Sequence, residues 1–342
     1  MVNLAENVSN LDLVKRNTAD IITEEDLKHL LEQKKDISAY IGRATTGPLH
    51  IGHLVALGKI FDLQNAGIKV KVLLADIHAA LDDLKANWAD LDNRVEYTQK
   101  CIELAFNWPE KIEFIRGSNF QLEKNYANDV LKLSTVTTVE RATRAASEVT
   151  RMKNPKVSEL IYPIMQALDE QYLDVDIQFG GLDQRHILAY AREVLPRLGY
   201  RKRIEIMTPL ISSLNGPGTK MSSSIPGSHI KVYDSEESIR KKIKDAYCPV
   251  GVIEDNLILQ IAKLLVFPSE NRLVIQRDEK FGGDVEIDTY AHLEMLFKEK
   301  GLHPVDLKNA IADFLVRKLA RAREYFDKHT DLLKELGEEF LP

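Results

Sequence analysis

The sequence predicts an α/β fold, a doubly wound parallel sheet of Rossmann-like type followed by a mainly α-helical C-terminal domain. Strand-like and helix-like segments alternate as far as residue 211, and the pattern beyond is mostly helical. Right-handed crossovers between parallel strands leave few other topologies. The 342 residues, 44% hydrophobic and 29% charged, suit a globular protein with two domains. We therefore expect a sheet domain over residues 1–225 and a helical domain over residues 226–342.

The elements of the sheet domain follow from periodicity and from terminator residues. The helix at 23–34 opens with a loose capping box, Thr23 followed three residues later by Asp26. Buried strands are predicted at 37–42, 69–75, 111–116, 175–180 and 203–211. Helices are predicted between them at 50–67, 88–106, 156–173 and 181–199. Gly67 ends the first of these helices, and Pro163 is expected to kink the third.

Two further segments interrupt this alternation. Residues 120–155 are predominantly helical and read as an insertion between the two halves of the sheet. Residues 216–226 form part of a stretch rich in Gly, Ser and Pro, which predicts a loop after the last strand. Beyond this loop the helical pattern carries basic runs, for example at 239–247 and 316–323.

Composition narrows the class of protein. A net charge of −6 argues against a generally basic, nonspecific nucleic-acid binder, although local patches could still hold a nucleic acid. Cys101 and Cys248 lack metal-ligand spacing, so we expect neither a zinc site nor a disulfide scaffold. No apolar stretch approaches the roughly 20 residues of a membrane span, and the first residues lack the apolar core of a signal peptide. We expect a cytoplasmic protein without a membrane or DNA partner.

The turn after the first buried strand of the parallel set carries two histidines, His50 and His53. Such turns lie at the carboxyl ends of parallel strands, where these folds bind ligands, and the N-terminus of the next helix favours anions. Thr45 and the residues beside it are small, so the backbone can approach a ligand closely. Imidazoles at this place can donate hydrogen bonds to phosphate oxygens in a transition state. The alternative is a strand–helix corner with two chance histidines.

The second motif, Lys-Met-Ser-Ser-Ser at 220–224, lies in the predicted loop. Its lysine can supply charge to a polyphosphate and its serines can supply hydrogen bonds, and a glycine-rich loop can close over a substrate. Alone, the motif also fits a solvated serine-rich loop. Together with His-Ile-Gly-His at 50–53, in this order across a doubly wound domain, it resembles the signatures of the class I aminoacyl-tRNA synthetases.

A closer resemblance is to the tyrosyl-tRNA synthetases of archaeal and eukaryotic cytosolic type. It covers residues from about 10 to 325, and its motifs stand in the family's order at 40–47, 75–79, 118–122, 162–173, 179–185, 220–224 and 303–310. Ser223 stands where many class I enzymes have a second lysine, as is common in this branch of the family. Lys220 is therefore the only positive side chain of its motif.

The predicted helix at 156–173 carries a polar stripe. Tyr162, Gln166, Asp169 and Leu173 are 4, 3 and 4 residues apart, which places them on one face. Buried polar groups need partners, so the stripe predicts a ligand site, unless it is a half-exposed edge of the helix. The resemblance implies that Tyr162 and Gln166, with Gln184, hold the ammonium of a tyrosine substrate. It implies that Asp169 and Tyr40 hold the phenolic hydroxyl.

The predicted nucleotide site combines the two signatures with the turn at 180–184. Gly180 would admit a nucleotide closely and Asp183 could bind ribose hydroxyls, although a tight turn with a capping aspartate is an alternative. For ATP binding we expect Thr45, Gly52, Gly180, Asp183, Met221, Ser222, Ser223 and Ser224, with His50, His53 and Lys220 as catalytic residues. His78 is ambiguous between a pocket residue and a packed core histidine.

The C-terminal domain is expected to read tRNA, although its basic runs are also typical of solvated helix faces. By resemblance, Phe281, His303 and Asp306 meet the anticodon, where an aromatic ring can stack on a base and polar side chains can bond base edges. Arg185 matches a position near the first base pair of the acceptor stem. The insertion at 120–155 matches the homodimer interface.

The resemblance implies a tyrosine–tRNA ligase activity: tyrosine and ATP give tyrosyl-adenylate and pyrophosphate, and the tyrosyl group passes to tRNA(Tyr). Mg²⁺ is expected with ATP, without a dedicated protein metal site. Tryptophanyl-tRNA synthetase is the nearest alternative, but an indole offers one N–H donor and no acceptor to Tyr40 and Asp169. A non-catalytic tRNA-binding paralogue would not need both signatures, and a small adenylyltransferase would not need the helical second domain.

Overall fold

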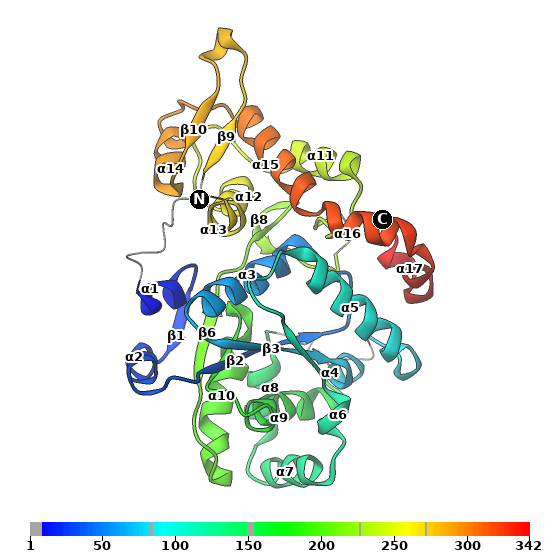
Figure 1. Ribbon diagram of the computed structural model, residues 1–342. Helices are drawn as coiled ribbons and strands as arrows, with labels where there is room; N and C mark the ends of the chain where they lie inside the picture. Colours follow the sequence, from blue (N-terminus) through cyan, green and yellow to red (C-terminus); the bar gives the residue numbers. More distant parts are fainter. Residues whose placement is uncertain (1–8, 83–84, 149–153, 226, 271) are drawn as a thin grey trace. The chain divides into compact units, whose positions relative to one another are not determined.

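The computed structural model describes residues 9–82, 85–148, 154–225, 227–270 and 272–342 (Figure 1). The ends of the expected insertion and loop include residues 149–153 and 226, which lie outside this description. The chain forms two compact units. One contains residues 1–46, 59–99 and 108–209, and the other contains residues 47–58, 100–107 and 210–342. A functional division at residue 225 stays a prediction.

The first unit is built on a six-stranded sheet with the order β1-β6-β5-β2-β3-β4. Five strands are parallel and β1 is antiparallel to β6. This confirms the predicted doubly wound α/β class. The strands are β1 (Asp20–Ile22), β2 (Ser38–Ala44), β3 (Lys69–Ala75), β4 (Glu113–Arg116), β5 (Ile177–Gly181) and β6 (Ile204–Thr208).

The topological switch point lies between β2 and β5, because the chain runs outward from β2 through β3 and β4 and then returns to β5 and β6. The two strands pair only at Ala39–Ile177 and Tyr40–Gln178, although β2 continues to Ala44. They therefore part at their carboxyl ends, which is where open α/β sheets bind ligands.

Helices of the first unit match the predicted periodicity. The long α9 continues through Pro163, and its apolar residues pack with those of α4, α7 and α10. Thr23 caps α2 by accepting the N–H of Asp26, as the capping motif predicts. The helices are α1 (Asn10–Lys15), α2 (Glu24–Gln33), α4 (Asp76–Leu81), η1 (Trp88–Asp90), α6 (Ser118–Gln121), α7 (Lys124–Ser134), α8 (Val139–Ala146), α9 (Val157–Tyr172), η2 (Leu182–Gln184), α10 (Arg185–Val194) and η3 (Leu195–Leu198). Two more helices, α3 (Ile51–Asn65) and α5 (Leu91–Ala105), have residues in both units.

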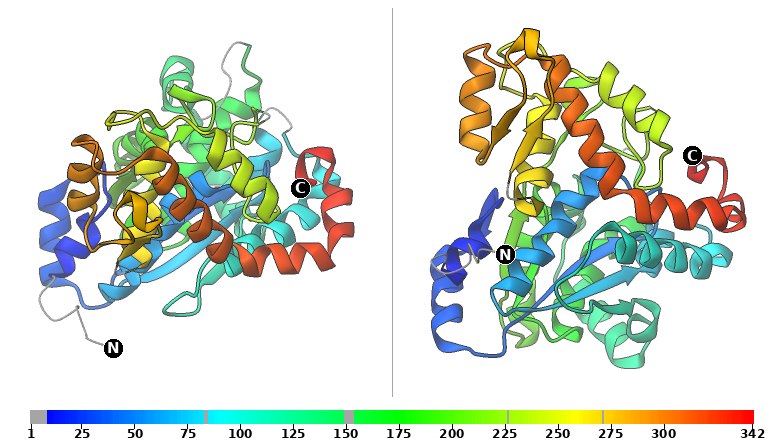
Figure 2. Two further views of the ribbon diagram at one scale, coloured as in Figure 1. Left: turned by 90° about the horizontal axis from the view of Figure 1, so that it is seen from above. Right: turned by 45° about the horizontal axis from the view of Figure 1, so that its top comes forward.

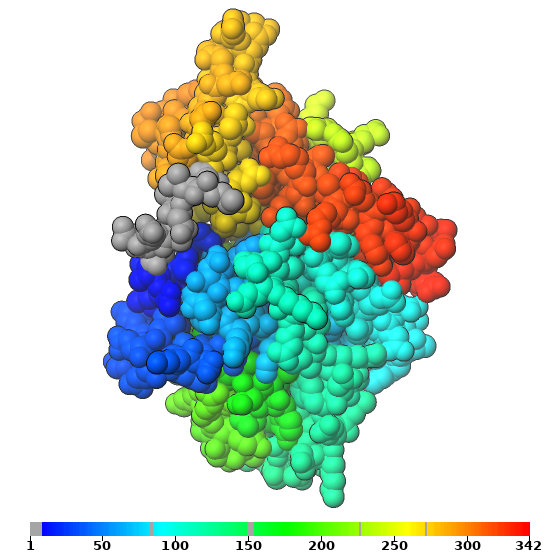
Figure 3. Space-filling model, viewed as in Figure 1, coloured from blue at the N-terminus to red at the C-terminus, as the bar shows by residue number. Residues whose placement is uncertain are grey.

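The second unit is mainly helical, as predicted, with α11 lying beside α15 (Figure 2). Its hairpin β9–β10 projects from the unit, and the tip carries η5 (Figure 3). The elements are β7 (Ser212–Ser213), β8 (Gly216–Lys220), α11 (Glu236–Asp245), α12 (Leu257–Ile261), η4 (Ala262–Val266), α13 (Phe267–Ser269), β9 (Leu273–Ile275), η5 (Glu279–Phe281), β10 (Val285–Ile287), α14 (Tyr290–Lys298), α15 (Pro304–Lys318), α16 (Ala320–Lys328), α17 (Thr330–Leu336) and η6 (Glu338–Phe340).

The short strands are the main difference from the sequence prediction. β1, β7, β9 and β10 have only 2 or 3 residues, too few for a clear alternation of apolar and polar side chains. The loop predicted at 216–226 begins instead as β8, in which Gly216 and Gly218 have φ values of 108° and 83°. Among the described residues, no helix is long and apolar enough to cross a membrane.

Candidate functional site

The predicted tyrosine site lies in the first unit, between β2 and α9. Tyr40 is on β2, and Tyr162, Gln166 and Asp169 are on α9, whose polar stripe therefore faces the sheet. Tyr40 is completely buried and its hydroxyl lies 3.4 Å from the carbonyl oxygen of Gln166. Tyr162 and Asp169 are also buried, which excludes the alternative of a half-exposed helix edge.

Asp169 is the centre of a buried hydrogen-bond network. Its Oδ1 atom accepts a bond from Gln121 Nε2 at 2.8 Å and another from the Tyr126 hydroxyl at 2.8 Å. Its Oδ2 atom lies 3.7 Å from His78 Nε2. The helix-borne carboxylate is thus fixed through one oxygen, and the other remains available to accept a substrate hydroxyl.

Burial sets the protonation of this network. It raises the pKa of Asp169 to about 7, against the opposing hydrogen bonds from Gln121 and Tyr126. Burial also lowers the pKa of His78 to about 4, so this imidazole is neutral at physiological pH. Burial, followed by the neighbouring Asp169, raises the pKa of Tyr40 well above its usual value. A neutral phenol beside a titratable carboxyl can donate and accept hydrogen bonds.

His78 lies in contact with the predicted tyrosine-site residues and is buried, so its role as a pocket residue stays a prediction. Its ring makes an edge contact with Tyr162 at a centroid distance of 4.7 Å, and its Nδ1 atom lies 3.3 Å from Gln121 Nε2. At the other end of the stripe, Gln166 Nε2 donates to Gln184 Oε1 at 3.1 Å. The structure therefore brings the two predicted amides together, on α9 and η2.

Sequence reasoning missed the contributions of Gln121 and Tyr126. Gln121 was visible only as part of a family motif, and the bond from Tyr126 depends on how α7 packs on α9. Gly117 matters for the same network, because a Cβ atom there would lie 2.5 Å from Gln121 Oε1 and 3.0 Å from Asp76 Oδ1. A larger residue at this position would force the end of the Gln121 side chain to move.

Two buried acids, Glu170 and Glu205, lie on α9 and β6, the elements near the predicted tyrosine site. Glu170 and Glu205 are completely buried, and their carboxyl oxygens have no hydrogen-bond partner among the described residues. In the sheet, Glu205 pairs with Gln178, which in turn pairs with Tyr40. Burial raises the pKa of both carboxyls, so the protonated forms are favoured and little charge is placed near Tyr40.

Three predicted nucleotide ligands lie at the carboxyl ends of the parting strands in the same unit. Thr45 follows β2, Gly180 is near the end of β5, and Asp183 is in η2. The Thr45 hydroxyl is buried and has no hydrogen-bond partner within the described part of the chain, so a ligand could satisfy it. At Gly180 a Cβ atom would lie 3.2 Å from Gln184 Cγ, which makes this turn tight.

The signature histidines lie in the second unit. His50 and His53 stack with ring centroids 3.6 Å apart. The N–H of Gly52 donates to His50 Nδ1 at 3.2 Å, and the N–H of His50 donates to His53 Nδ1 at 3.2 Å. Because each Nδ1 atom accepts a backbone N–H, each neutral ring carries its proton on Nε2. In this tautomer both imidazoles can donate a hydrogen bond from Nε2–H.

The Lys220–Ser224 segment lies against the histidine turn within this unit. A Cβ atom at Gly47 would lie 2.8 Å from Ser223 Oγ, and one at Gly52 would lie 3.4 Å from Met221 Cβ. Lys220 is exposed at the end of β8, whereas Met221 is buried. Met221 and Ser223 of the second motif therefore lie beside the turn that carries the two histidines.

The predicted RNA contacts are all accessible. Phe281 is 63% exposed at the tip of the β9–β10 hairpin, where Lys280 Nζ lies 5.0 Å from its ring centroid. His303 caps α15 by accepting the N–H of Val305, and Asp306 follows in the first turn. In the first unit, Arg185 begins α10 and pairs with Asp20 at 2.7 Å.

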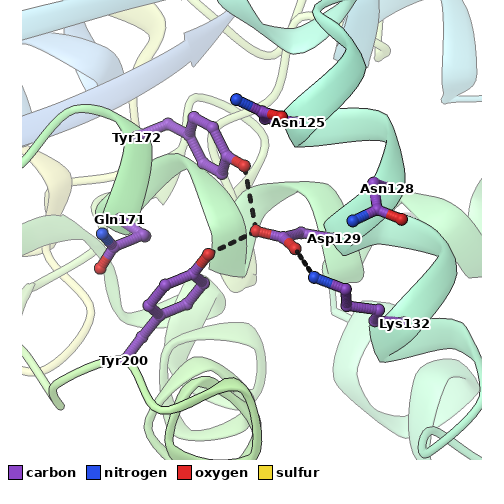
Figure 4. Close-up of a pocket in the computed structure, with 7 residues that line it drawn as sticks. All are labelled: Asn125, Asn128, Asp129, Lys132, Gln171, Tyr172 and Tyr200. Atoms are coloured by element: carbon purple, nitrogen blue, oxygen red, sulfur yellow. Dashed lines mark hydrogen bonds and ion pairs between the residues drawn. The ribbon is translucent and has the colours of Figure 1, made fainter.

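A polar pocket of about 330 Å³ in the first unit contains none of the predicted site residues (Figure 4). Asp129 accepts hydrogen bonds there from the hydroxyls of Tyr172 and Tyr200 and from Lys132 Nζ (Figure 4). These bonds join α7 to α9 and to the segment before β6. The arrangement fixes the helical insertion to α9, the helix that carries Asp169.

Comparisons with known proteins identify the family. Residues 32–320 match the family described as tRNA synthetases class I (W and Y). The tyrosine–tRNA ligase of Archaeoglobus fulgidus is 45% identical over 316 residues, covering 92% of this chain and 96% of the relative. That of Methanocaldococcus jannaschii is 45% identical over 318 residues, covering 93% and 99%.

A solved structure supports the same conclusion. The crystal structure of tyrosyl-tRNA synthetase complexed with L-tyrosine from Archaeoglobus fulgidus superposes with a TM-score of 0.88 at 43% identity, covering 96% of this chain and 99% of that one. The resemblance drawn from the sequence motifs is thereby confirmed, and the relatives favour tyrosine over the tryptophan alternative. The chain belongs to the tyrosine–tRNA ligase family of class I aminoacyl-tRNA synthetases.

Proposed function

We propose that this chain performs the tyrosine–tRNA ligase reaction with the residues of the two sites described above. The tyrosine carboxylate attacks the α-phosphate of ATP, forming tyrosyl-adenylate and releasing pyrophosphate. His50 and His53 donate from Nε2 to phosphate oxygens, and Lys220 adds positive charge as negative charge redistributes. The observation that carries this proposal is the hydrogen bonding of both Nδ1 atoms, which leaves Nε2–H as the donor on each ring.

In the same proposal, the pocket of the first unit selects tyrosine. Asp169 accepts the phenolic O–H and Tyr40 donates to the same oxygen. Tyr162, Gln166 and Gln184 hold the ammonium group. The support is the fixed Oδ1 of Asp169, because a carboxylate already bonded to Gln121 and Tyr126 presents its second oxygen in one orientation.

The family uses ATP as a substrate, and we assign its binding to Thr45, Gly180 and Asp183 in the first unit and to Gly52 and Met221–Ser224 in the second. Among the described residues, no group of three or more His, Cys, Asp or Glu side chains is placed to hold a metal ion. Mg²⁺ is commonly held through substrate phosphates with one or two carboxylates, so we propose that it arrives with ATP.

We further propose that tRNA(Tyr) is read by Phe281, His303 and Asp306 at the anticodon and by Arg185 at the acceptor stem. An exposed aromatic ring beside a lysine suits stacking on an unpaired base. A homodimer through the insertion is supported by large apolar side chains exposed there and at the start of α9: Leu122, Leu131, Val136, Val139 and Val157. Cys101 and Cys248 are buried and form no disulfide within the described part of the chain, which suits action in the reducing cytoplasm.

ATP–pyrophosphate exchange tests the assignment. Tyrosine alone among the twenty amino acids should support exchange, and His53→Ala and Lys220→Ala should slow it while calorimetric tyrosine affinity stays nearly intact, because their contacts form mainly in the transition state. The exposed His292→Ala serves as the matched control. Exchange with tryptophan instead of tyrosine, or lost tyrosine affinity in both site variants, would contradict the proposal.

A further inference from the structure

An ion pair between Asp76 and Arg116 lies at the carboxyl ends of β3 and β4, in the first unit. Asp76 follows β3 as the first residue of α4, and Arg116 is the last residue of β4. Arg116 Nε lies 2.6 Å from Asp76 Oδ2. The Asp76 side chain is completely buried, whereas 31% of the Arg116 side chain is exposed. Because a buried carboxylate is costly unless it is paired and hydrogen-bonded, its second oxygen also needs partners.

The second oxygen of Asp76 joins the starts of two short helices. Its Oδ1 atom accepts the N–H of Ile77 at 3.0 Å and the N–H of Ser118 at 2.9 Å. Ile77 is in the first turn of α4, and Ser118 is the first residue of α6. These helices have 6 and 4 residues, whereas an isolated helix needs about 12–15 residues to be stable in water. Their positions therefore depend on tertiary contacts such as the shared carboxylate of Asp76.

Each of the two helices brings one side chain to Asp169. Helix α4 carries His78, and helix α6 carries Gln121. Gln121 Nε2 donates to Asp169 Oδ1 at 2.8 Å and lies 3.3 Å from His78 Nδ1. His78 Nε2 lies 3.7 Å from Asp169 Oδ2. Each oxygen of the Asp169 carboxylate is thus approached by a side chain from a helix that is bonded to Asp76.

We propose that Asp76 and Arg116 are positioning residues for the selection of tyrosine, which fix the orientation of Asp169 through Gln121 and His78. This inference rests on the role proposed above for Asp169. The pair acts through the two helices and does not touch the substrate. When the pair is lost, α4 and α6 can shift, and the Asp169 carboxylate is no longer held in one direction. Since a hydrogen bond weakens as its geometry departs from the optimum, discrimination between tyrosine and phenylalanine falls.

Asp92 offers a matched control, because it contacts the same guanidinium from the solvent side. Arg116 Nη1 lies 2.5 Å from Asp92 Oδ1, and 82% of the Asp92 side chain is exposed. An exposed ion pair contributes little, because water and salt screen the charges and both side chains lose conformational freedom. Asp92→Asn therefore removes a charge beside Arg116 and leaves the buried contact with Asp76 in place.

Two substitutions break the buried pair from opposite sides. Asp76→Asn keeps an oxygen for the N–H groups of Ile77 and Ser118 and turns an amide donor toward the guanidinium. Arg116→Met keeps an unbranched apolar stem and removes the charge. In both variants the ratio of kcat/KM for tyrosine to that for phenylalanine, measured by pyrophosphate exchange, should fall about two- to tenfold, the effect of weakening one hydrogen bond. Arg116→Lys should recover most of this ratio, and Asp92→Asn should keep the parental value.

The ratio separates positioning from stability, because a loss of folded protein lowers both kcat/KM values equally. Since Arg116 is partly exposed, its variants keep the test available if Asp76→Asn destabilises the fold. A parental ratio in Arg116→Met, no recovery in Arg116→Lys, or an equally large fall in Asp92→Asn would overturn the inference. Asp169→Asn is measured in parallel: if it also keeps the parental ratio, the proposed role of Asp169 fails as well, and if it lowers the ratio, only the role of the pair fails.

Discussion

Replacing Asp169 by asparagine tests the tyrosine pocket most directly. The amide keeps the shape of the side chain and can keep an oxygen for the bonds from Gln121 and Tyr126. Alanine would instead leave these two buried donors without an acceptor, at a cost of about 1–3 kcal/mol for each, and would confuse stability with recognition. In Asp169→Asn the main change is at Oδ2, where an acceptor becomes a donor.

The expected magnitude follows from the bond that is lost. A hydrogen bond to a charged acceptor contributes about 1.5–3 kcal/mol, whereas phenylalanine has no hydroxyl and loses nothing. The ratio of kcat/KM for tyrosine to that for phenylalanine should therefore fall about 10- to 150-fold. Because burial raises the pKa of Asp169 to about 7, the assay belongs above pH 8, where the carboxyl is ionised.

Tyr40→Phe provides the internal comparison. This substitution removes a neutral hydrogen bond, which contributes about 0.5–1.5 kcal/mol. The ratio of kcat/KM for tyrosine to that for phenylalanine should therefore fall only about two- to tenfold. Pyrophosphate exchange with each amino acid gives both ratios on one preparation, and changes in global stability cancel between the two substrates. Parental selectivity in both variants would show that the phenolic hydroxyl is not bound by this pair of residues.

Three further outcomes are expected. The raised pKa of Asp169 favours the folded state below pH 3.8, and this contribution to stability is lost as the pH rises to about 7. The Tm of Asp169→Asn, measured in a series of thermal melts, should therefore rise relative to that of the parent between about pH 5 and pH 8. His303→Ala and Asp306→Ala should reduce tRNA charging and leave pyrophosphate exchange intact; a parallel loss of both activities without unfolding would refute the RNA assignment. Asp129→Ala should lower the free energy of unfolding by about 1–3 kcal/mol in urea titrations, because two tyrosine hydroxyls and a lysine lose their common acceptor. Burial opposes ionisation of Asp129, but hydrogen bonds led by Tyr200 hold its pKa below the usual value, so this contribution is present above pH 3.8 and lost below the folded-state pKa.

The sequence predicted the sheet best where its parallel strands are buried and rich in Val and Ile, as β3 and β6 are. The prediction of 69–75 coincides with β3, and the stripe of Tyr162, Gln166 and Asp169 does face β2 on one helix. The periodicity of apolar residues indicates which face of a helix or strand is buried. For these elements, burial alone determines their type and their orientation toward the sheet.

Other features depend on contacts between distant segments, which periodicity does not record. The antiparallel strand β1 is defined by its pairing with β6, and the bond from Tyr126 to Asp169 joins residues 43 apart in sequence. The tautomers of His50 and His53 depend on backbone N–H directions at a helix start. The ring of His229 lies near that of His50, and Lys231 forms a backbone bridge with His50. Both contacts require the chain after residue 224 to return to the histidine turn.

Gly117 has a consequence for how substrate preference could evolve. A Cβ atom at this position would lie too close to Gln121 and Asp76, so a methyl group there would displace Gln121, which donates a hydrogen bond to Asp169. A library restricted to side chains lining the amino-acid pocket would omit this position. Selection for enzymes that accept altered tyrosines should recover small substitutions at Gly117, because a single carbon atom there would shift Gln121 and, through it, the Asp169 carboxylate, without replacing any residue that faces the substrate.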